Sequence, residues 1–489
     1  MDKKVVLAID LGTTGNRVMA FARDGSIVAR SYYEFPQIFP QPGWVEHDPG
    51  QILSTTLKAL QEVCTKVGAE NIDSIGITNQ RETTILWDKN TGQPVYNAIV
   101  WQDRRTENTC LELAARRDLL KQKTGLFLDP YFSATKVKWI IDQVAGVKGR
   151  IAKGDILFGT PDTWVLWNLT ARRAHLTEPS NASRTMLFNI SLLNFDQELL
   201  QIFGVPENIL PGIMPSDSLF GYLKKEICGR EIPIHGVLGD QQASLFAQCA
   251  GQAGAVKATY GTGIFVMTNT GKQLRISETL INTVSWQIKK EVNYALEGSI
   301  FMGGAAIQWL RDNLKIIEKA ADSEAIATAL TDNEGVYFVP ALQGLGAPYW
   351  EAQARGAITG LTRKSNRANI IRAALEAMAY QVCDVLNEMK KTSLEPLCQL
   401  RVDGGAAVNN FLMQFQADIA RVPVERATIT ETTALGAAGV AAIATGFWDE
   451  QGFAGTIKRD RVFKPLLDEQ KAQASYQGWQ TAVNRCRQR

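Results

Sequence analysis

The stretch Val5-Val6-Leu7-Ala8-Ile9-Asp10-Leu11-Gly12-Thr13-Thr14-Gly15 decides the fold of this chain. Its first five residues are apolar, which predicts a buried strand. The strand leads into Asp10 and then into a turn whose small residues let backbone N–H groups approach an anion closely. A second strand-like run, Arg17 to Phe21, follows at once and predicts a hairpin. Standing alone, such a hairpin is more often structural than catalytic.

The same pattern returns about half a chain later, in Ala255 to Met267, where a Gly-Thr-Gly turn again separates two strand-like runs. Two such hairpins predict one architecture used twice, with the turns gripping a polyphosphate from opposite sides of a cleft. The alternative to an internal repeat is that the two short motifs resemble each other by chance. No Pro- or Ser-rich linker marks a boundary, so the repeat alone places the domains at residues 1–250 and 251–489.

Composition narrows the class of protein. The chain has 489 residues, of which 45% are hydrophobic and 21% charged, as is ordinary for a soluble globular protein. A net charge of +2 without a clustered basic patch argues against a nucleic-acid partner. The seven cysteines form no C-x-x-C pair, so neither a zinc ribbon nor a disulfide framework is predicted.

The chain also lacks a clear membrane or export signal. The run from Ala434 to Trp448 holds three glycines and is too short for a membrane span, so it predicts a buried helix. The first apolar run ends at Asp10 and is too short for a signal peptide. We therefore expect a cytoplasmic protein with no membrane span.

Strands and helices alternate in both halves, which predicts an α/β fold. Asp48-Pro49 is a helix start and Gly68 a helix stop, with apolar residues at helical spacing between them. Ala368 to Met389 predicts a long helix. Arg401-Val402-Asp403 predicts a strand that ends at a glycine-rich turn.

Several standard catalytic signatures are absent. The sequence has no G-x-x-x-x-G-K-[ST] phosphate loop, no complete dinucleotide fingerprint and no G-x-S-x-G nucleophile elbow. A nucleotide site would instead need two opposed hairpins and a metal-binding carboxylate, for which Asp10 and Asp240 are suited. Taken singly, Asp240 is better explained as the N-cap of a helix.

Longer stretches that combine charged, polar and aromatic residues identify a protein family more specifically than any glycine turn. They are Pro42-Gly43-Trp44-Val45-Glu46-His47-Asp48-Pro49, Gly76-Ile77-Thr78-Asn79-Gln80-Arg81-Glu82-Thr83-Thr84, Asn97-Ala98-Ile99-Val100-Trp101-Gln102, Asp129-Pro130-Tyr131-Phe132-Ser133, Gly239-Asp240-Gln241-Gln242 and Gly404-Gly405-Ala406. Through them the chain resembles the FGGY family of carbohydrate kinases from about Val5 to Trp479.

The resemblance implies two ribonuclease-H-like, actin-like ATPase domains flanking a cleft in which ATP and an acceptor meet. It implies ATP and Mg²⁺ as cofactors, and transfer of the γ-phosphoryl group of ATP to the terminal hydroxyl of glycerol, giving sn-glycerol 3-phosphate. It is compatible with a homodimer or a homotetramer, between which the sequence does not choose.

The resemblance also implies residue roles. Asp240 is the base that accepts the hydroxyl proton, and Asp10 lies on the magnesium side. The residues that contact glycerol are Arg81, Glu82, Trp101, Tyr131, Asp240, Gln241 and Phe265. Those at the phosphates are Thr13, Thr14, Arg17 and Thr262, and those along the nucleotide are Gly304, Gln308, Gly405 and Asn409.

Three places depart from the commonest family pattern. Leu11 replaces a frequent glutamine, and Gly15 replaces a frequent serine, so a hydroxyl near the phosphates is missing. Alternatively, Gly15 holds a positive φ that serine would strain. Lys224 to Arg230 is short and unlike the sugar-phosphate-responsive loop of some relatives, so regulation is not carried over.

Two other functions compete with glycerol phosphorylation. A kinase of the same family acting on another polyol or a ketose sugar would need a wider pocket, with Trp101 or Phe265 replaced. An actin-like or chaperone-like ATPase would have no use for Arg81, Glu82 and Trp101 as a polyol set. Without the flanking matches, Arg81-Glu82 would be a solvated surface pair and Trp101 a core residue. Release of ADP that depends on an acceptor separates the classes.

Overall fold

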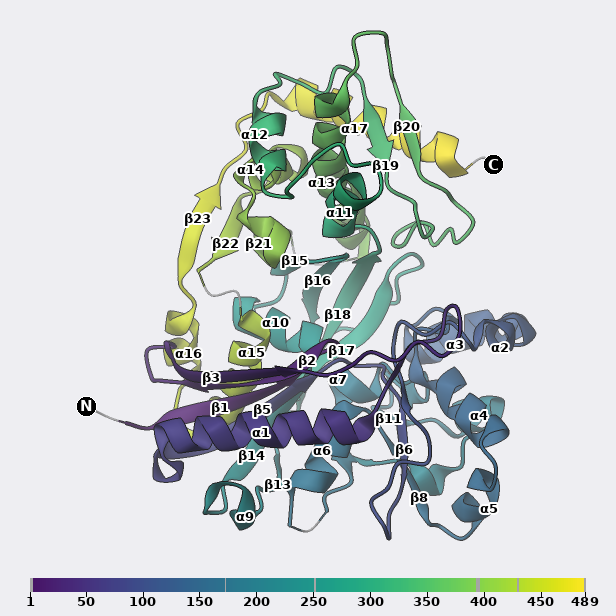
Figure 1. The fold of residues 1–489 in the computed structure, drawn as a ribbon, viewed down its shortest axis with the longest axis vertical. Helices are drawn as coiled ribbons and strands as arrows, with labels where there is room; N and C mark the ends of the chain where they lie inside the picture. The colour runs from purple at the N-terminus through teal and green to yellow at the C-terminus, as the bar shows by residue number, and fades with distance from the viewer. Residues whose placement is uncertain (1–2, 172, 250–251, 393–395, 429–430, 488–489) are drawn as a thin grey trace.

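Two β-sheets, one from each half of the chain, organise the protein (Figure 1). The computed structural model describes residues 3–171, 173–249, 252–392, 396–428 and 431–487. The first sheet has the strand order β13 (Leu219–Tyr222), β14 (Pro233–Gly239), β5 (Ile72–Asn79), β1 (Val5–Leu11), β2 (Gly15–Phe21) and β3 (Ile27–Glu34). The second has the order β17 (Ile281–Ile288), β18 (Glu291–Ile300), β16 (Ile264–Gly271), β15 (Val256–Tyr260), β21 (Leu400–Asp403), β22 (Val424–Ala427) and β23 (Arg459–Phe463). The predicted two-domain α/β fold is confirmed.

The two glycine-threonine hairpins occupy equivalent places in the two sheets. β1 pairs with β2 antiparallel and with β5 parallel. β15 pairs with β16 antiparallel and with β21 parallel. Each hairpin therefore forms the centre of its own sheet, and the repeat read from two short motifs extends to the strand topology.

The remaining described elements surround these sheets. Helices of the first half are α1 (Pro49–Val67), α2 (Glu107–Glu112), α3 (Arg117–Thr124), α4 (Ser133–Gln143), α5 (Val147–Ala152), α6 (Pro161–Leu169), α7 (Pro179–Ala182), α8 (Gln197–Phe203), α9 (Lys225–Cys228) and α10 (Asp240–Cys249). Those of the second half are α11 (Gly304–Asp312), α12 (Asp322–Thr328), α13 (Arg367–Thr392), α14 (Asn410–Ala420), α15 (Thr432–Thr445), α16 (Glu450–Thr456) and α17 (Glu469–Arg487). Short strand pairs join β4 (Glu46–His47) with β7 (Ala98–Ile99), β6 (Ile85–Asp88) with β8 (Ile156–Gly159), β9 (Leu176–Thr177) with β12 (Gly212–Ile213), β10 (Phe188–Asn189) with β11 (Asn194–Phe195), and β19 (Tyr337–Val339) with β20 (Ala357–Thr359).

Helix α1 begins and ends where its local sequence predicts. The Asp48 carboxylate accepts a hydrogen bond from the Gly50 amide at 2.7 Å, which satisfies a free N–H of the first turn. Gly68, with φ of 79°, ends the helix. Its apolar face, which includes Ile52 and Leu60, is buried among the strands of the first sheet.

Helices α10 and α15 lie between the two sheets (Figure 1). They share a core cluster with residues of β1 and β2 on one side and of β16 to β18 on the other. Helix α15 approaches the first sheet closely because glycines face it: a Cβ built on Gly76 would lie 2.2 Å from the carbonyl oxygen of Ala437. The run from Ala434 to Trp448 thus contains a buried helix, as predicted, but this helix packs on the sheet of the first half.

The division into domains 1–250 and 251–489 stays a prediction, because residues 250 and 251 lie outside the described part of the chain. Among the described residues, no helix is both long enough and apolar enough to cross a membrane.

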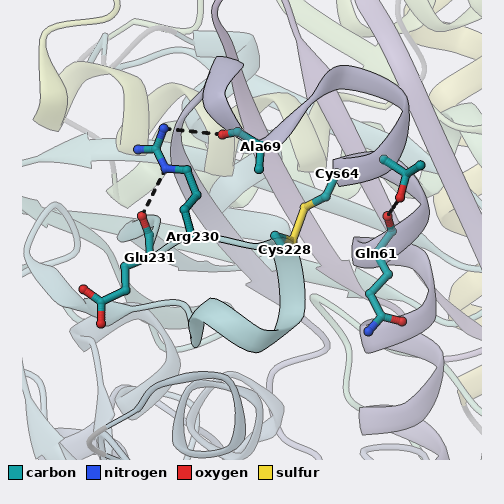
Figure 2. The surroundings of a disulfide bond; sticks show 7 residues. Gln61, Cys64, Ala69, Cys228, Arg230 and Glu231 are labelled. Atoms are coloured by element: carbon teal, nitrogen blue, oxygen red, sulfur yellow. Dashed lines mark hydrogen bonds between the residues drawn. A yellow bond between two sulfur atoms is a disulfide. The ribbon is translucent and has the colours of Figure 1, made fainter.

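The structure contains one disulfide, although the sequence indicated no disulfide framework. Cys64 near the end of α1 is bonded to Cys228 at the end of α9, with their Cα atoms 5.9 Å apart (Figure 2). The two residues are 164 positions apart, so no spacing motif could reveal them.

Candidate active site

Asp240 lies where β14 gives way to α10. Its Oδ1 accepts a hydrogen bond from the Gln241 amide at 2.7 Å, which fits the expectation of an acid at a helix start. The same oxygen lies 3.2 Å from Nε of Arg81, and 31% of the side chain stays exposed, so a small molecule can reach the carboxylate. Desolvation raises the pKa of Asp240, and the nearby Arg81 charge opposes that rise.

Arg81 follows β5 and is the most connected side chain of the site. Besides Asp240, its guanidinium contacts Glu297 through two hydrogen bonds of 2.6 and 3.0 Å. It also donates to the Tyr131 hydroxyl at 3.3 Å and lies 3.6 Å from Glu82. Arg81 and Glu82 are each only 2% exposed, which excludes the solvated surface pair.

Two further residues of this cluster, Glu297 on β18 and Arg184 after α7, carry no sequence motif that marks them. Arg184 donates from Nε to Glu82 at 2.6 Å and from Nη2 to Glu297 at 3.2 Å. Burial opposes the charge of Glu297, but the Arg184 and Arg81 guanidiniums outweigh it and lower the pKa of Glu297 to about 2. Glu297 therefore links two arginines of the first half to the sheet of the second.

Lys257 on β15 is a third unpredicted member of the site. Its ammonium donates to Oε1 of Gln241 at 2.5 Å and to the Thr259 hydroxyl at 3.0 Å. The Gln241 amide nitrogen is thereby turned toward Asp240, with its Nε2 3.5 Å from Oδ2. Burial lowers the pKa of Lys257. The Gln241 side chain is thus oriented as a donor on the Asp240 side.

The two aromatic residues expected to contact the carbon atoms of glycerol, Trp101 and Phe265, come from different halves of the chain. Trp101 meets Tyr131 edge to face at 5.7 Å between ring centroids, and its indole donates to the Thr13 hydroxyl at 3.0 Å. Phe265 lies on β16, opposite Thr259 in the register of the second sheet. Trp101 is half-buried and bonded to the first hairpin, so it is not a simple core residue.

Asp10 and Arg17 face each other across the first hairpin. Nε of Arg17 lies 3.5 Å from Asp10, and Nη1 donates to Glu431 at 2.5 Å. Burial raises the pKa of Asp10 to about 7, against the influence of Arg17 and with that of Asp240 and Glu431. Asp10 therefore lies within electrostatic range of the Asp240 carboxylate.

The other positions of the first hairpin differ in accessibility. Thr14 is exposed, and Leu11 is a buried residue of β1. The φ of Gly15 lies outside the left-handed region, so the positive-φ alternative is wrong. A Cβ on Gly15 would lie 2.5 Å from the carbonyl oxygen of Tyr33, so serine would require β2 and β3 to separate.

The predicted nucleotide residues gather around the second hairpin. The Gly304 amide donates to the Gly261 carbonyl at 2.9 Å, and the Gly303 amide to that of Thr262, also at 2.9 Å. Gly404, just before Gly405, packs so closely that a Cβ there would lie 2.6 Å from the carbonyl oxygen of Tyr260. Gly405 itself faces open space, and Gln308 on α11 is exposed.

Asn409 connects this group to α12. It caps α14 by accepting from the Leu412 amide at 3.0 Å and donates to Ser323 of α12 at 3.4 Å. An open cavity of about 620 Å³ is lined by one face of α12 and the residues on either side of it, Ala321 and Ala329.

Comparisons with known proteins identify the family of this chain. The family model described as FGGY family of carbohydrate kinases, N-terminal domain, matches residues 5–247, and that of the C-terminal domain matches residues 256–445. The chain is 55% identical over 483 residues to the glycerol kinase of Aquifex aeolicus, covering 98% of each chain. It is 52% identical to glycerol kinase 2 of Thermotoga maritima, covering 99% of this chain and 98% of the relative.

Solved structures show the same fold. The Plasmodium falciparum glycerol kinase with ADP superposes with a TM-score of 0.93 at 36% identity, covering 99% of this chain and 98% of that one. The xylulose kinase of Lactobacillus acidophilus has a TM-score of 0.87 at 23% identity, covering 97% and 96%, and shows the fold alone. With both domain models matched and relatives above 50% identity over nearly the whole length, this chain belongs to the FGGY family of carbohydrate kinases.

Proposed function

We propose that this protein transfers the γ-phosphoryl group of ATP to the terminal hydroxyl of glycerol, forming sn-glycerol 3-phosphate. The observation that carries the proposal is the cluster of buried Arg81 and Glu82 with half-buried Tyr131 and Asp240, with Trp101 beside Tyr131. The relatives that share this chain's full length and are named glycerol kinases support it. The structural match to a glycerol kinase solved with ADP supports ATP as the donor of the phosphoryl group.

A three-carbon polyol needs donors and acceptors of both charge signs, because each hydroxyl can donate and accept. Arg81 supplies donors, Glu82 supplies acceptors, and the two are adjacent and desolvated. Trp101 and Phe265 would enclose the carbon atoms from the first and second halves of the chain respectively. In this proposal Gln241 donates to a hydroxyl, since Lys257 occupies its Oε1.

Asp240 is the group that would accept the proton of the attacking hydroxyl. Phosphoryl transfer depends on positioning and charge stabilisation and needs a group that takes this proton. The pKa of Asp240 is raised by desolvation, which makes the carboxylate a better proton acceptor than an exposed aspartate. Arg81 holds the same carboxylate in place through Oδ1, and the proposal assigns Oδ2, which Gln241 Nε2 approaches at 3.5 Å, to the substrate.

Asp10 suits a magnesium ion that is bound largely through the nucleotide. Mg²⁺ commonly uses one or two carboxylates together with substrate phosphates. Within the described residues, no group of three or more His, Cys, Asp and Glu side chains could hold a metal by itself, which fits that pattern. When bound, Mg²⁺ would neutralise charge on the phosphates, while Thr13, Thr14, Arg17 and Thr262 contact them.

Along the nucleotide, the proposed contacts are made by Gly304, Gln308, Gly405 and Asn409. Gly405 faces open space, so a nucleotide can approach its backbone. A homodimer or a homotetramer stays a prediction, and light scattering in solution would measure which of the two forms.

The test is ATP turnover over a panel of acceptors. Glycerol is expected to exceed propane-1,2-diol and propane-1,3-diol in kcat/KM by about 10²-fold or more, because a missing hydroxyl leaves a buried partner such as Arg81 or Glu82 unpaired. A ketose such as xylulose that is phosphorylated faster than glycerol would instead assign the site to another sugar. ADP release at the same rate without any acceptor would assign it to the ATPase class.

A further inference from the structure

Glu297 stands out because it belongs to the second half of the chain but contacts two arginines of the first half, Arg81 and Arg184. It is fully buried on β18. Both of its oxygens are engaged by Arg81, and Oε1 also accepts from Arg184 at 3.2 Å and from the Ser299 hydroxyl at 3.3 Å. A carboxylate with four donors is held in one orientation.

The charges of the site balance only when Glu297 is included. Three cations and three anions are joined by contacts of 3.6 Å or less, directly or through Gln241: Arg81, Arg184 and Lys257 against Glu82, Asp240 and Glu297. Removing one anion from a buried set leaves an uncompensated cation, which is costly and forces neighbouring side chains to move.

We propose that Glu297 and Arg184 are positioning residues for the acceptor site: Glu297 fixes Arg81, and Arg184 fixes Glu82. Neither touches the acceptor. Arg184 donates to the oxygen of Glu82 that lies nearest Arg81, so the two arginines and two glutamates form one closed ring of contacts. This proposal rests on the proposed function, since it concerns the same acceptor site.

The first test is Glu297→Gln. The NH₂ group of the new glutamine must point its N–H donors at the N–H donors of a guanidinium. Arg81 must therefore shift, and its N–H groups no longer point at the hydroxyls of the acceptor. We expect the glycerol KM to rise about 10-fold or more, while the ATP KM changes less than about twofold. A purely structural role would lower the thermal midpoint and shift both KM values together.

The matched control is Glu376→Gln, which alters another buried carboxylate paired with an arginine. Glu376 accepts from Arg372 at 2.7 Å within α13. It should leave both KM values unchanged. A milder variant, Ser299→Ala, removes only one hydrogen bond to Glu297 and should raise the glycerol KM about two- to fivefold.

Unchanged glycerol KM in Glu297→Gln, or equal changes in both KM values, would overturn the proposal. If Glu297→Gln does not fold, the KM values of Ser299→Ala test the proposal instead: an unchanged glycerol KM, or equal changes in the glycerol and ATP KM values, would overturn it. Wild-type turnover with glycerol tests the proposed function separately, because that activity is measured before any variant is compared.

A second inference comes from the Cys64–Cys228 pair, which lies apart from the site. Figure 2 shows the bond joining the long helix α1 to the short helix α9. Helix α9 buries none of its residues, and it lies in the connection between β13 and β14. Cys64 is 5% exposed, whereas Cys228 is half-buried at the end of α9.

We infer that this pair is a thiol–disulfide exchange site for a small disulfide such as oxidised glutathione. The Cys228 thiolate, the more accessible one, attacks the small disulfide and releases one thiol. The Cys64 thiolate then attacks the sulfur of Cys228 and releases the second, so two protein thiols become a disulfide and one small disulfide becomes two thiols. When the disulfide is formed, it joins the segment before β14, the strand that leads to Asp240, to the end of α1.

The pair is tested in mixtures of reduced and oxidised glutathione, with the fraction of disulfide counted by alkylation and mass spectrometry. We expect conversion between the two forms, and a thermal midpoint about 4–10 °C lower in the reduced protein because a long loop is no longer closed. Cys64→Ser should lose this dependence, and the control Cys110→Ser, a buried unpaired thiol, should keep it. Thiols that persist at every ratio, or a disulfide that resists excess reduced glutathione, would overturn the inference.

Discussion

Replacing Asp240 by asparagine is expected to lower kcat by about 10²- to 10⁴-fold, the range that a positioned general base contributes. Asparagine keeps the shape and can still accept from the Gln241 amide, but it cannot take the hydroxyl proton. The glycerol KM should change much less, because the lost interaction belongs to the transition state. Steady-state kinetics with glycerol and ATP varied separately measures both.

The control for Asp240→Asn is Asp196→Asn. Asp196 also starts a helix, accepting from the amides of Glu198 and Leu199, and asparagine caps helices about as well as aspartate. Its kcat should match the wild type. A near-native kcat in Asp240→Asn would leave Asp240 with the role of a helix-start residue only.

Arg81→Leu is expected to lower the free energy of unfolding by about 3–5 kcal/mol, since removing one partner of a buried ion pair leaves uncompensated charge. The carboxylates of Glu297, Glu82 and Asp240 would lose their shared cation in a desolvated place. Glycerol turnover should also be lost. Urea unfolding of the free protein measures the stability change without substrate.

Arg311→Leu provides the comparison for stability. Arg311 pairs with Asp312 on an exposed part of α11 at 2.6 Å, and exposed pairs contribute about 0–1 kcal/mol. An Arg81→Leu protein with the stability of Arg311→Leu would show that the Arg81 network is not needed for folding. Its kinetics would then report on glycerol binding alone.

The balance of charge around Arg81 explains why one site can serve both binding and stability. The arginine orients Asp240, contacts Tyr131 and joins Glu297 of the other sheet. Arg81 and Glu297 are buried, so the contact between them restricts the position of the rest of the network. A site assembled in this way is rigid before the acceptor arrives, which reduces the entropy lost on binding.

Local signals in the sequence were enough to predict individual elements. Helix α1 begins after Asp48 and ends at Gly68, because capping and chain-reversal preferences act within a few residues. The two hairpins and the buried helix α15 follow from similar short patterns. The family resemblance added the positions of Arg81, Glu82, Trp101 and Asp240, which spacing alone would have left as surface, core or cap residues.

Only the tertiary structure decided which distant residues meet. Arg81 and Glu297 are 216 positions apart, and Cys64 and Cys228 are 164 apart. Glu297 lies within an ordinary strand, and no period or motif marks the partner of a buried charge. The sequence by itself determined the elements and the family, because short-range preferences act along the chain. The pairing of charges across the two sheets was decided by packing, because burial and charge compensation depend on what the fold brings together.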